Sequence, residues 1–310
     1  VVRSSLVPGT TDGVIIPILQ EYSQKKAGRD FGIAVNPEFL QAGKALRCFL
    51  KPSRIIIGEY DQRSGDALEG IYRDFSAPIL RTDIRTAEMI KYSSNCFLAT
   101  KISFINEIGN MCKRLGIDVY AVARGMAYDP RIGGQFLNAG CGFGGSCLPK
   151  DLEAFISAAK RLGCEPRLLQ SVLEVNKAQA SRMVEMARAE LGGLSSRRIA
   201  VLGLAFKANT DDITNSPALE IIDLLLQQGA QVKAYDPKAM KKARQVLPGE
   251  VEYCLSAQRA VQDSDCVLIV TDWDEFKDES LYVGKMVIDG RRALDPDRAR
   301  GISGYQGICW

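Results

Sequence analysis

One glycine-rich segment places a cysteine in a setting that favours nucleophilic chemistry. Residues 140–151 read Gly-Cys-Gly-Phe-Gly-Gly-Ser-Cys-Leu-Pro-Lys-Asp. Such a loop lets the backbone approach a ligand closely, and Pro149 suits the first turn of a following helix. We therefore expect Cys147 at a helix N-terminus beside Lys150, where the positive end of the helix dipole and the lysine charge both favour the thiolate. Asp151 would lie one turn further on and could position a water. The alternative is a buried, unreactive thiol in a structural loop.

The absence of histidine narrows the chemistry further. It excludes a Ser-His-Asp triad, a Cys-His pair and a histidine general base. The nine cysteines are irregularly spaced and form no Cys-x-x-Cys pair. This pattern indicates reduced thiols of a cytoplasmic protein, and it favours neither a disulfide framework nor a metal site.

Three further polar residues are candidates for the same chemistry. Lys91 and Asn95 are four residues apart in a helical segment, so a cation and an amide share one helix face and could hold a developing oxyanion. Glu38 follows a predicted strand, at the edge where ligands gather in open α/β sheets. The alternatives are a solvated helix face for the first two residues and an exposed loop carboxylate for Glu38.

A second candidate site follows a strand near residue 200. Gly203-Leu204-Ala205-Phe206-Lys207 resembles a phosphate-binding turn but lacks the Gly-x-Gly-x-x-Gly spacing, so it predicts a looser phosphate site with Lys207 as its charge. Asp236 ends the next predicted strand. It is either a ribose-binding acid or a turn residue before Pro237.

Strands and helices alternate at both ends of the chain, and long helical segments lie between them. Strands are predicted at residues 1–6, 31–35, 54–58, 198–203, 231–236, 266–270 and 285–288, and helices at 15–22, 66–75, 88–115, 118–126, 165–191 and 217–228. The pattern predicts an α/β protein with a partial Rossmann-like parallel sheet, a central long-helix domain and a second Rossmann-like domain. The expected boundaries are 1–84, 85–194 and 195–310.

The bulk composition gives no sign of a polyanionic partner. Net charge is +3, and 46% of the residues are hydrophobic. We therefore expect neither nucleic-acid nor membrane binding, whereas a small anionic ligand held by a few local cations remains open.

Together these segments resemble the UDP-glucose/GDP-mannose dehydrogenase family over essentially the whole chain. The motifs, in the order of that family, are NPEFL, EMIKYSSN, DPRIG, GFGGSCLPKD, VLGLAFKANTDD, AYDP and IDGRR. Their form is most similar to the UDP-glucose branch. The resemblance implies a homodimeric, NAD-dependent enzyme that oxidises the C6 alcohol of a nucleotide sugar, UDP-glucose in this branch, to a carboxylate in two hydride transfers.

The resemblance also implies roles for particular residues. Cys147 would attack the aldehyde formed first, giving a thiohemiacetal and then a thioester that water hydrolyses. Glu38 would be the acid/base residue, Lys91 and Asn95 would support the oxyanion, and Asp151 would help organise water. The implied substrate-binding residues are Arg131, from the partner subunit, with Phe136, Leu137, Gly144, Phe206, Lys207 and Arg291. The implied cofactor-binding residues are Ser5 and Lys150.

The chain departs from the family pattern at several points. No glycine-rich phosphate turn is found in residues 1–84, so we expect the first half of the NAD-binding domain to be absent and the chain alone to be inactive. Ser5 stands where the family has threonine, Ala42 where it has a second acid, and Thr214 where it has arginine. These departures keep open a non-catalytic nucleotide-sugar-binding or dimerisation module, or a relative acting on GDP-mannose or a UDP-N-acetyl-hexosamine.

Overall fold

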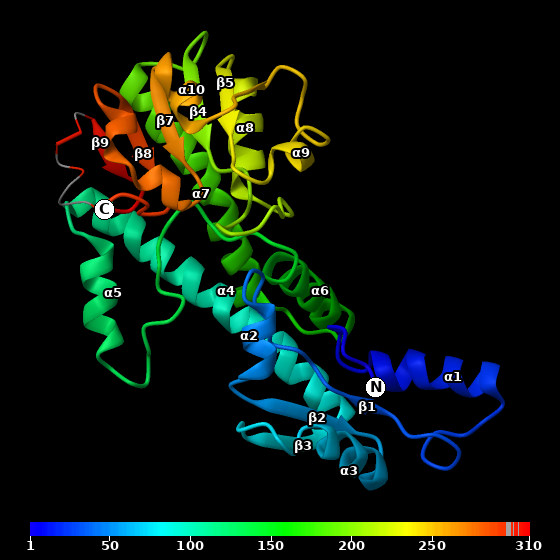
Figure 1. Ribbon diagram of the computed structural model, residues 1–310. Helices are drawn as coiled ribbons and strands as arrows, with labels where there is room; N and C mark the ends of the chain where they lie inside the picture. The colour runs from blue at the N-terminus through cyan, green and yellow to red at the C-terminus, as the bar shows by residue number, and fades with distance from the viewer. Residues whose placement is uncertain (296–298, 300, 303) are drawn as a thin grey trace. The chain divides into compact units, whose positions relative to one another are not determined.

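The computed structural model describes residues 1–295, 299, 301–302 and 304–310. Contacts divide the chain into two compact units: residues 1–97 with 151–165, and residues 98–150 with 166–310 (Figure 1). The division into three domains at residues 84 and 194 differs from these units and stays a prediction.

The N-terminal unit is built on a small three-stranded sheet of order β1-β2-β3. Its elements are η1 (Thr11–Ile15), α1 (Ile16–Ser23), β1 (Ala34–Val35), α2 (Ala45–Leu50), β2 (Ile55–Glu59), α3 (Gln62–Ile71), β3 (Ile79–Asp83), the first part of α4 (Ile84–Leu115) and most of α6 (Leu148–Arg161). Strands β2 and β3 are parallel, as predicted, but β1 runs antiparallel to β2. This sheet is therefore mixed.

The predicted strand at residues 1–6 is wrong. Only Val2 pairs, in a single bridge to Val35. Because β1 has only two residues, it offers room for no more than a single paired residue on this side. The backbone of Val2 donates to Ala34 O and accepts from Asn36 N, both at 2.8 Å.

Strand β2 forms the core of this unit because both of its faces are buried. Ile56 packs on one face with Ile16, Ile84 and other apolar residues, and Ile55 and Ile57 pack on the other face with residues such as Leu68. Successive side chains of a strand point to opposite faces, so three consecutive isoleucines serve two cores.

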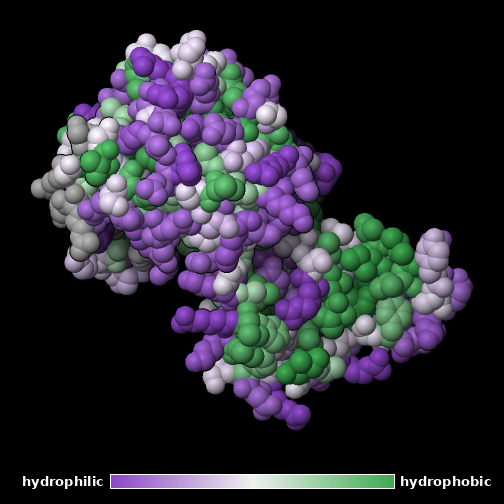
Figure 2. All heavy atoms as spheres, turned by 45° about the horizontal axis from the view of Figure 1, so that its top comes forward, coloured by the Kyte–Doolittle hydropathy of each residue, from purple (hydrophilic) through white to green (hydrophobic). Residues whose placement is uncertain are grey.

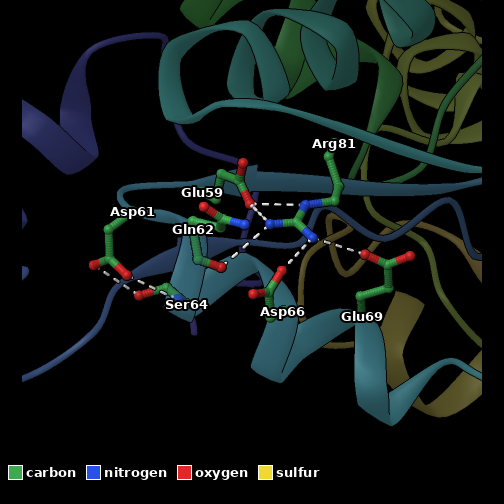
Figure 3. A network of polar contacts seen from close by, with 7 residues as sticks. All are labelled: Glu59, Asp61, Gln62, Ser64, Asp66, Glu69 and Arg81. Atoms are coloured by element: carbon green, nitrogen blue, oxygen red, sulfur yellow. Dashed lines mark hydrogen bonds and ion pairs between the residues drawn. The ribbon is translucent and has the colours of Figure 1, made fainter.

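A guanidinium group joins the sheet to α3 (Figure 3). Arg81 of β3 donates from Nε to Glu59 of β2 at 2.9 Å, and from Nη1 to Asp66 at 2.5 Å and Glu69 at 2.9 Å on α3. The hydrogen bonds that Arg81 donates to Asp66, Glu59 and Glu69 raise the pKa of Arg81. One cation therefore connects two strands and a helix at the edge of the sheet.

Helix α1 tolerates a proline and keeps an apolar face at the surface. Pro17 lies in the first turn, where its missing N–H costs nothing. Ile18, Leu19 and Tyr22 of α1 are exposed, as is Val14 of the preceding η1. Figure 2 shows apolar surface gathered over this helix. An area of this kind is typical of a contact surface.

The C-terminal unit begins with long helices that the sequence predicted well. They are the rest of α4, α5 (Val119–Ala127) and α7 (Arg167–Leu191). Asp118 caps α5 by accepting from Tyr120 N, and α7 ends at Gly192 in the left-handed region. The capping signals thus fixed both helix ends within two residues.

A fully parallel six-stranded sheet completes this unit (Figure 1), in the order β6-β5-β4-β7-β8-β9. Its elements are β4 (Arg198–Leu202), α8 (Pro217–Gln227), β5 (Gln231–Tyr235), α9 (Met240–Ala243), β6 (Glu252–Tyr253), α10 (Ala257–Gln262), β7 (Cys266–Ile269), η2 (Asp274–Lys277), η3 (Glu279–Tyr282), β8 (Met286–Asp289) and β9 (Tyr305–Gly307). This is a doubly wound order, which places ligands beyond the carboxyl ends of the strands.

Candidate functional site

The predicted lysine and glutamate meet within the N-terminal unit. Lys91 is 4% exposed, and its Nζ donates to the main-chain oxygen of Glu38 at 2.6 Å and lies 3.3 Å from Glu38 Oε1. The second carboxylate oxygen of Glu38 accepts from Leu40 N at 2.5 Å. The ammonium therefore compensates the Glu38 charge, and the two residues provide a proton donor and a proton acceptor in one place.

The predicted amide and aspartate form a second buried pair in this unit. Asn95 is 8% exposed and Asp151 is 1% exposed, and Asn95 Nδ2 donates to Asp151 Oδ2 at 2.6 Å. Asn95 lies one helical turn after Lys91 on α4, as the spacing predicted. The solvated helix face that was the alternative for these two residues is therefore wrong.

Cys147 differs from the other thiols in its surroundings. It directly precedes α6, whose first turn holds Pro149, and its Sγ lies 3.7 Å from Ser146 Oγ. Among the nine cysteines only Cys147 and Cys164 are exposed. Burial raises the pKa of Cys96 to about 12 and that of Cys309 to about 11, which keeps such thiols protonated. Exposure at a helix start leaves Cys147 accessible to an electrophile.

The glycine loop before Cys147 packs closely on the segment after β4. Gly145 has φ +88°, and a Cβ at this position would lie 2.9 Å from the Phe206 ring. Gly145 N donates to Thr214 O at 2.8 Å, and Asn215 Nδ2 donates to Gly145 O at 3.2 Å. Gly144 is buried against Asn215. These contacts explain why the loop requires glycine, and they place it beside Phe206, one of the predicted substrate-binding residues.

The C-terminal unit contains a cavity of about 310 Å³ where those residues gather. Phe206, Lys207 and Arg291, all predicted, line it. Its other walls are Tyr120, Asn138, Ala139, Asp272 and Arg292. Arg291 Nε donates to Val270 O at 2.8 Å. Three cations and two aromatic rings around one cavity suit an anionic ligand with a planar group.

Two buried aspartates hold the loops that carry these cations. Asp236 accepts from the backbone of Leu204 and Ala205, and from Trp273 Nε1 at 3.1 Å. Asp289 accepts from Arg291 N at 2.8 Å, and burial raises its pKa. Asp236 thus stabilises the turn before Lys207. This favours the interpretation of Asp236 as a structural turn residue over that of a ribose-binding acid.

The remaining predicted residues lie as follows. Arg131 is exposed and pairs with Asp129, with Nη2 at 2.6 Å from Oδ2. Leu137 is buried next to the cavity residue Asn138, and Phe136 has φ +64°. Ser5 is half-buried, and Lys150 is exposed in the first turn of α6. Their binding roles stay predictions.

Arg292 and Tyr120 were missed by the sequence analysis. Arg292 donates from both terminal nitrogens to Asp118, at 2.7 and 3.0 Å, and lies 4.2 Å from the centre of the Tyr120 ring. It adopts φ +52°, which is costly for a side chain of this kind. The second arginine of the IDGRR motif, Arg292, could have indicated a site residue, but its partner Asp118 is 174 residues away in the sequence.

Replacing Gly203 by alanine is expected to destabilise the C-terminal unit. Gly203 has φ +95°, and a Cβ would lie 2.6 Å from Thr271 N. Strain and collision should lower the free energy of unfolding by about 3 kcal/mol, measured by urea denaturation. Gly249→Ala is the matched control, because no atom lies within 4 Å of its added carbon. Equal stabilities of the two variants would contradict this account.

Replacing Asp118 by asparagine should destabilise the fold in a pH-dependent way. The Arg292 hydrogen bonds lower the pKa of Asp118. A lowered carboxyl pKa stabilises the fold above the ordinary pKa, and this contribution is lost as the pH falls through the folded value. We expect a loss of about 1 kcal/mol near neutral pH, since the pair is partly exposed. Urea unfolding should show this difference shrinking below about pH 4, and a constant difference would refute the pairing.

Within the described ranges, no group of three or more Cys, Asp or Glu side chains is arranged to hold a metal ion. None of the described helices has the length and apolar character needed to cross a membrane.

Comparison with known proteins identifies relatives along the whole chain. Models of the UDP-glucose/GDP-mannose dehydrogenase family match residues 1–76 (NAD binding domain), 85–178 (central domain) and 200–296 (UDP binding domain). A UDP-glucose 6-dehydrogenase of Bacillus subtilis is 44% identical over 313 residues, covering 98% of this chain and 71% of that protein. One from Haloferax volcanii is 45% identical over 303 residues, covering 95% and 70%.

Solved structures give the same result. A UDP-glucose dehydrogenase from Pyrobaculum islandicum aligns with a TM-score of 0.94 at 44% identity, covering 99% of this chain and 70% of that chain. A UDP-D-ManNAc dehydrogenase from Pyrococcus horikoshii aligns with a TM-score of 0.84 at 29% identity, covering 99% and 71%. The predicted fold class is confirmed by these similarities.

Proposed function

The chain belongs to the UDP-glucose/GDP-mannose dehydrogenase family, and we propose that it carries out the NAD-dependent oxidation of UDP-glucose to UDP-glucuronate. The observation that carries this proposal is the cysteine of the GFGGSCLPKD loop, exposed at the start of α6. The three UDP-glucose dehydrogenases compared above are 44–45% identical to this chain, whereas the UDP-D-ManNAc dehydrogenase is 29% identical. Higher identity favours glucose as the sugar.

In the proposed reaction, bound NAD would supply the hydride acceptor for two successive oxidations at C6. The Cys147 thiolate adds to the C6 aldehyde, which forms a C–S bond and an oxyanion. Loss of the second hydride converts this adduct to a thioester. Water then attacks the thioester carbon, the C–S bond breaks, and the carboxylate leaves while Cys147 regains its thiolate and the two protons of the water pass to solvent.

The buried pairs of the N-terminal unit suit the charges that arise in these steps. Lys91 and Asn95 carry donors that can stabilise an oxyanion, and Glu38 can remove and return a proton. Asp151, fixed by Asn95, can orient the attacking water. Ser5 and Lys150 offer a hydroxyl group and a cation, which fit the hydroxyl and amide groups of NAD.

The C-terminal cavity supports a nucleoside diphosphate as the non-reacting part of the substrate. Lys207 and Arg291 provide charge for two phosphates, and the rings of Tyr120 and Phe206 provide apolar walls for a base. A homodimer is also part of this proposal. Phe104, Met111 and Leu115 are exposed at spacings of seven and four on α4, which favours a contact between helices.

The first test is a calorimetric titration of this chain with UDP-glucose and with GDP-mannose. Saturable binding of UDP-glucose alone supports the family branch. A chimera with a glycine-rich βαβ segment of a relative before Val1 is then assayed for NADH. A model of the NAD-binding domain matches residues 1–76, and this match does not show that half of the domain is absent. The absence of that half and the inactivity of the chain alone therefore stay predictions.

A non-catalytic nucleotide-sugar-binding module is the second candidate. Ala42 and Thr214, where the family has an acid and an arginine, favour it. It predicts that the chimera binds UDP-glucose but forms no NADH. Formation of UDP-glucuronate would exclude this candidate.

A further inference from the structure

A second cavity lies in the N-terminal unit and is lined by cations without acidic partners. It encloses about 200 Å³. Arg3, Lys51 and Arg54 lie on its walls, and none of them forms an ion pair with another described residue. Positive charge gathered around a cavity in this way raises the local concentration of anions.

Arg54 is the most constrained of these cations. Its guanidinium lies 3.8 Å from the centre of the Phe39 ring, and Nη2 donates to Ser94 Oγ at 3.1 Å. Burial lowers the pKa of Arg54, yet the group stays charged. A partly desolvated charge without a counterion is costly, and a bound anion would offset that cost.

Arg3 is held in place by neutral groups. Its Nη1 donates to Asn36 Oδ1 at 2.9 Å and to Tyr72 Oη at 2.7 Å. Asn36 is itself fixed, because its Nδ2 donates to Ile56 O at 2.9 Å. The position of this guanidinium is therefore set by the sheet, while its charge is not neutralised.

One carboxylate, that of Glu38, also lines the cavity. Its charge is already balanced, since Lys91 Nζ lies 3.3 Å from Oε1 and Leu40 N donates to Oε2. The three lining cations thus keep a net positive charge. The cavity is smaller than the roughly 300–1,000 Å³ of sites for drug-sized ligands, so it suits a small anion.

We propose that this cavity binds a phosphate-class anion through Arg3, Lys51 and Arg54. The ligand is either a free ion, such as phosphate or pyrophosphate, or the phosphate group of a larger molecule. This site is distinct from the cavity of the C-terminal unit. The proposal does not depend on the oxidation chemistry proposed above.

Cys48 offers a site-specific readout because it is half-buried and lines the same cavity. The alkylation rate of Cys48 by iodoacetamide is measured by peptide mass spectrometry, with Cys164, exposed and outside the cavity, as the internal reference. Separate arms contain phosphate, pyrophosphate, NAD, and sodium chloride at equal ionic strength. We expect a phosphate compound to slow alkylation of Cys48 but not of Cys164. Protection by NAD alone identifies a larger molecule as the source of the phosphate.

Charge variants provide the matched comparison. Lys44 and Lys51 flank α2 at its two ends, but only Lys51 lines the cavity. Lys51→Gln should raise the half-protecting concentration about ten-fold, as expected for the loss of one charged hydrogen bond, and Lys44→Gln should leave it unchanged. Arg54→Gln should act like Lys51→Gln. Absence of protection by every phosphate compound, or equal effects of the two lysine variants, would overturn the proposal.

Discussion

Replacing Cys147 by serine is expected to lower the formation of UDP-glucuronate at least about a thousand-fold, because a hydroxyl group at this position is a far weaker nucleophile and yields no thioester. The side chain is exposed and precedes α6, so the change should not disturb folding. The product is quantified by chromatography in the chimera described above. Calorimetry should show that the variant still binds UDP-glucose.

The matched control for this prediction is Cys164→Ser. Cys164 is the other exposed thiol but lies outside the glycine loop. It should keep the activity of the parent protein. A second readout needs no turnover: UDP-glucose should slow the alkylation of Cys147 and leave that of Cys164 unchanged. Full activity of the Cys147 variant, or a loss shared with the Cys164 variant, would remove Cys147 from the mechanism.

Local signals predicted most of the fold correctly. The long helices were found because their apolar period, the capping residue Asp118 and the terminal glycines Gly116 and Gly192 act within a few residues of each other. The parallel sheet of the C-terminal unit followed from strands that alternate with helices. The reduction of residues 1–6 to a single bridge and the antiparallel direction of β1 were not predictable, because pairing partners and strand direction depend on residues far apart in the chain.

The candidate sites divide in the same way. The position of Cys147 before α6 and the shared helix face of Lys91 and Asn95 were predictable, because the signal lies within one short segment. The roles of these residues stay predictions. The contact of Lys91 with Glu38 spans 53 residues, and that of Arg292 with Asp118 spans 174. Periodicity gives no information at such separations. The anion cavity was missed for this reason, since its three cations come from separate segments.

The second large effect is expected in the C-terminal cavity, where Arg291→Ala should weaken binding of UDP by about 10- to 100-fold. Arg291 and Lys207 line a cavity with no more than one carboxylate, that of Asp272, among its walls. Loss of a charged hydrogen bond to a phosphate costs about 1.5–3 kcal/mol, which corresponds to this range. Calorimetry with UDP measures binding alone, so the result depends neither on NAD nor on the oxidation of a sugar.

Lys241→Ala controls for the change in net charge. Lys241 is an exposed lysine of α9 that does not line the cavity. If attraction were due to the overall field, both variants would lose affinity alike, and the loss would vanish at high salt. If the cavity holds the diphosphate, Arg291→Ala and Lys207→Ala lose affinity and Lys241→Ala does not. An equal loss of UDP affinity in all three variants would therefore show that the nucleotide does not bind in this cavity. A loss confined to the Arg291 and Lys207 variants would assign recognition of the diphosphate to the loops held by Asp236 and Asp289.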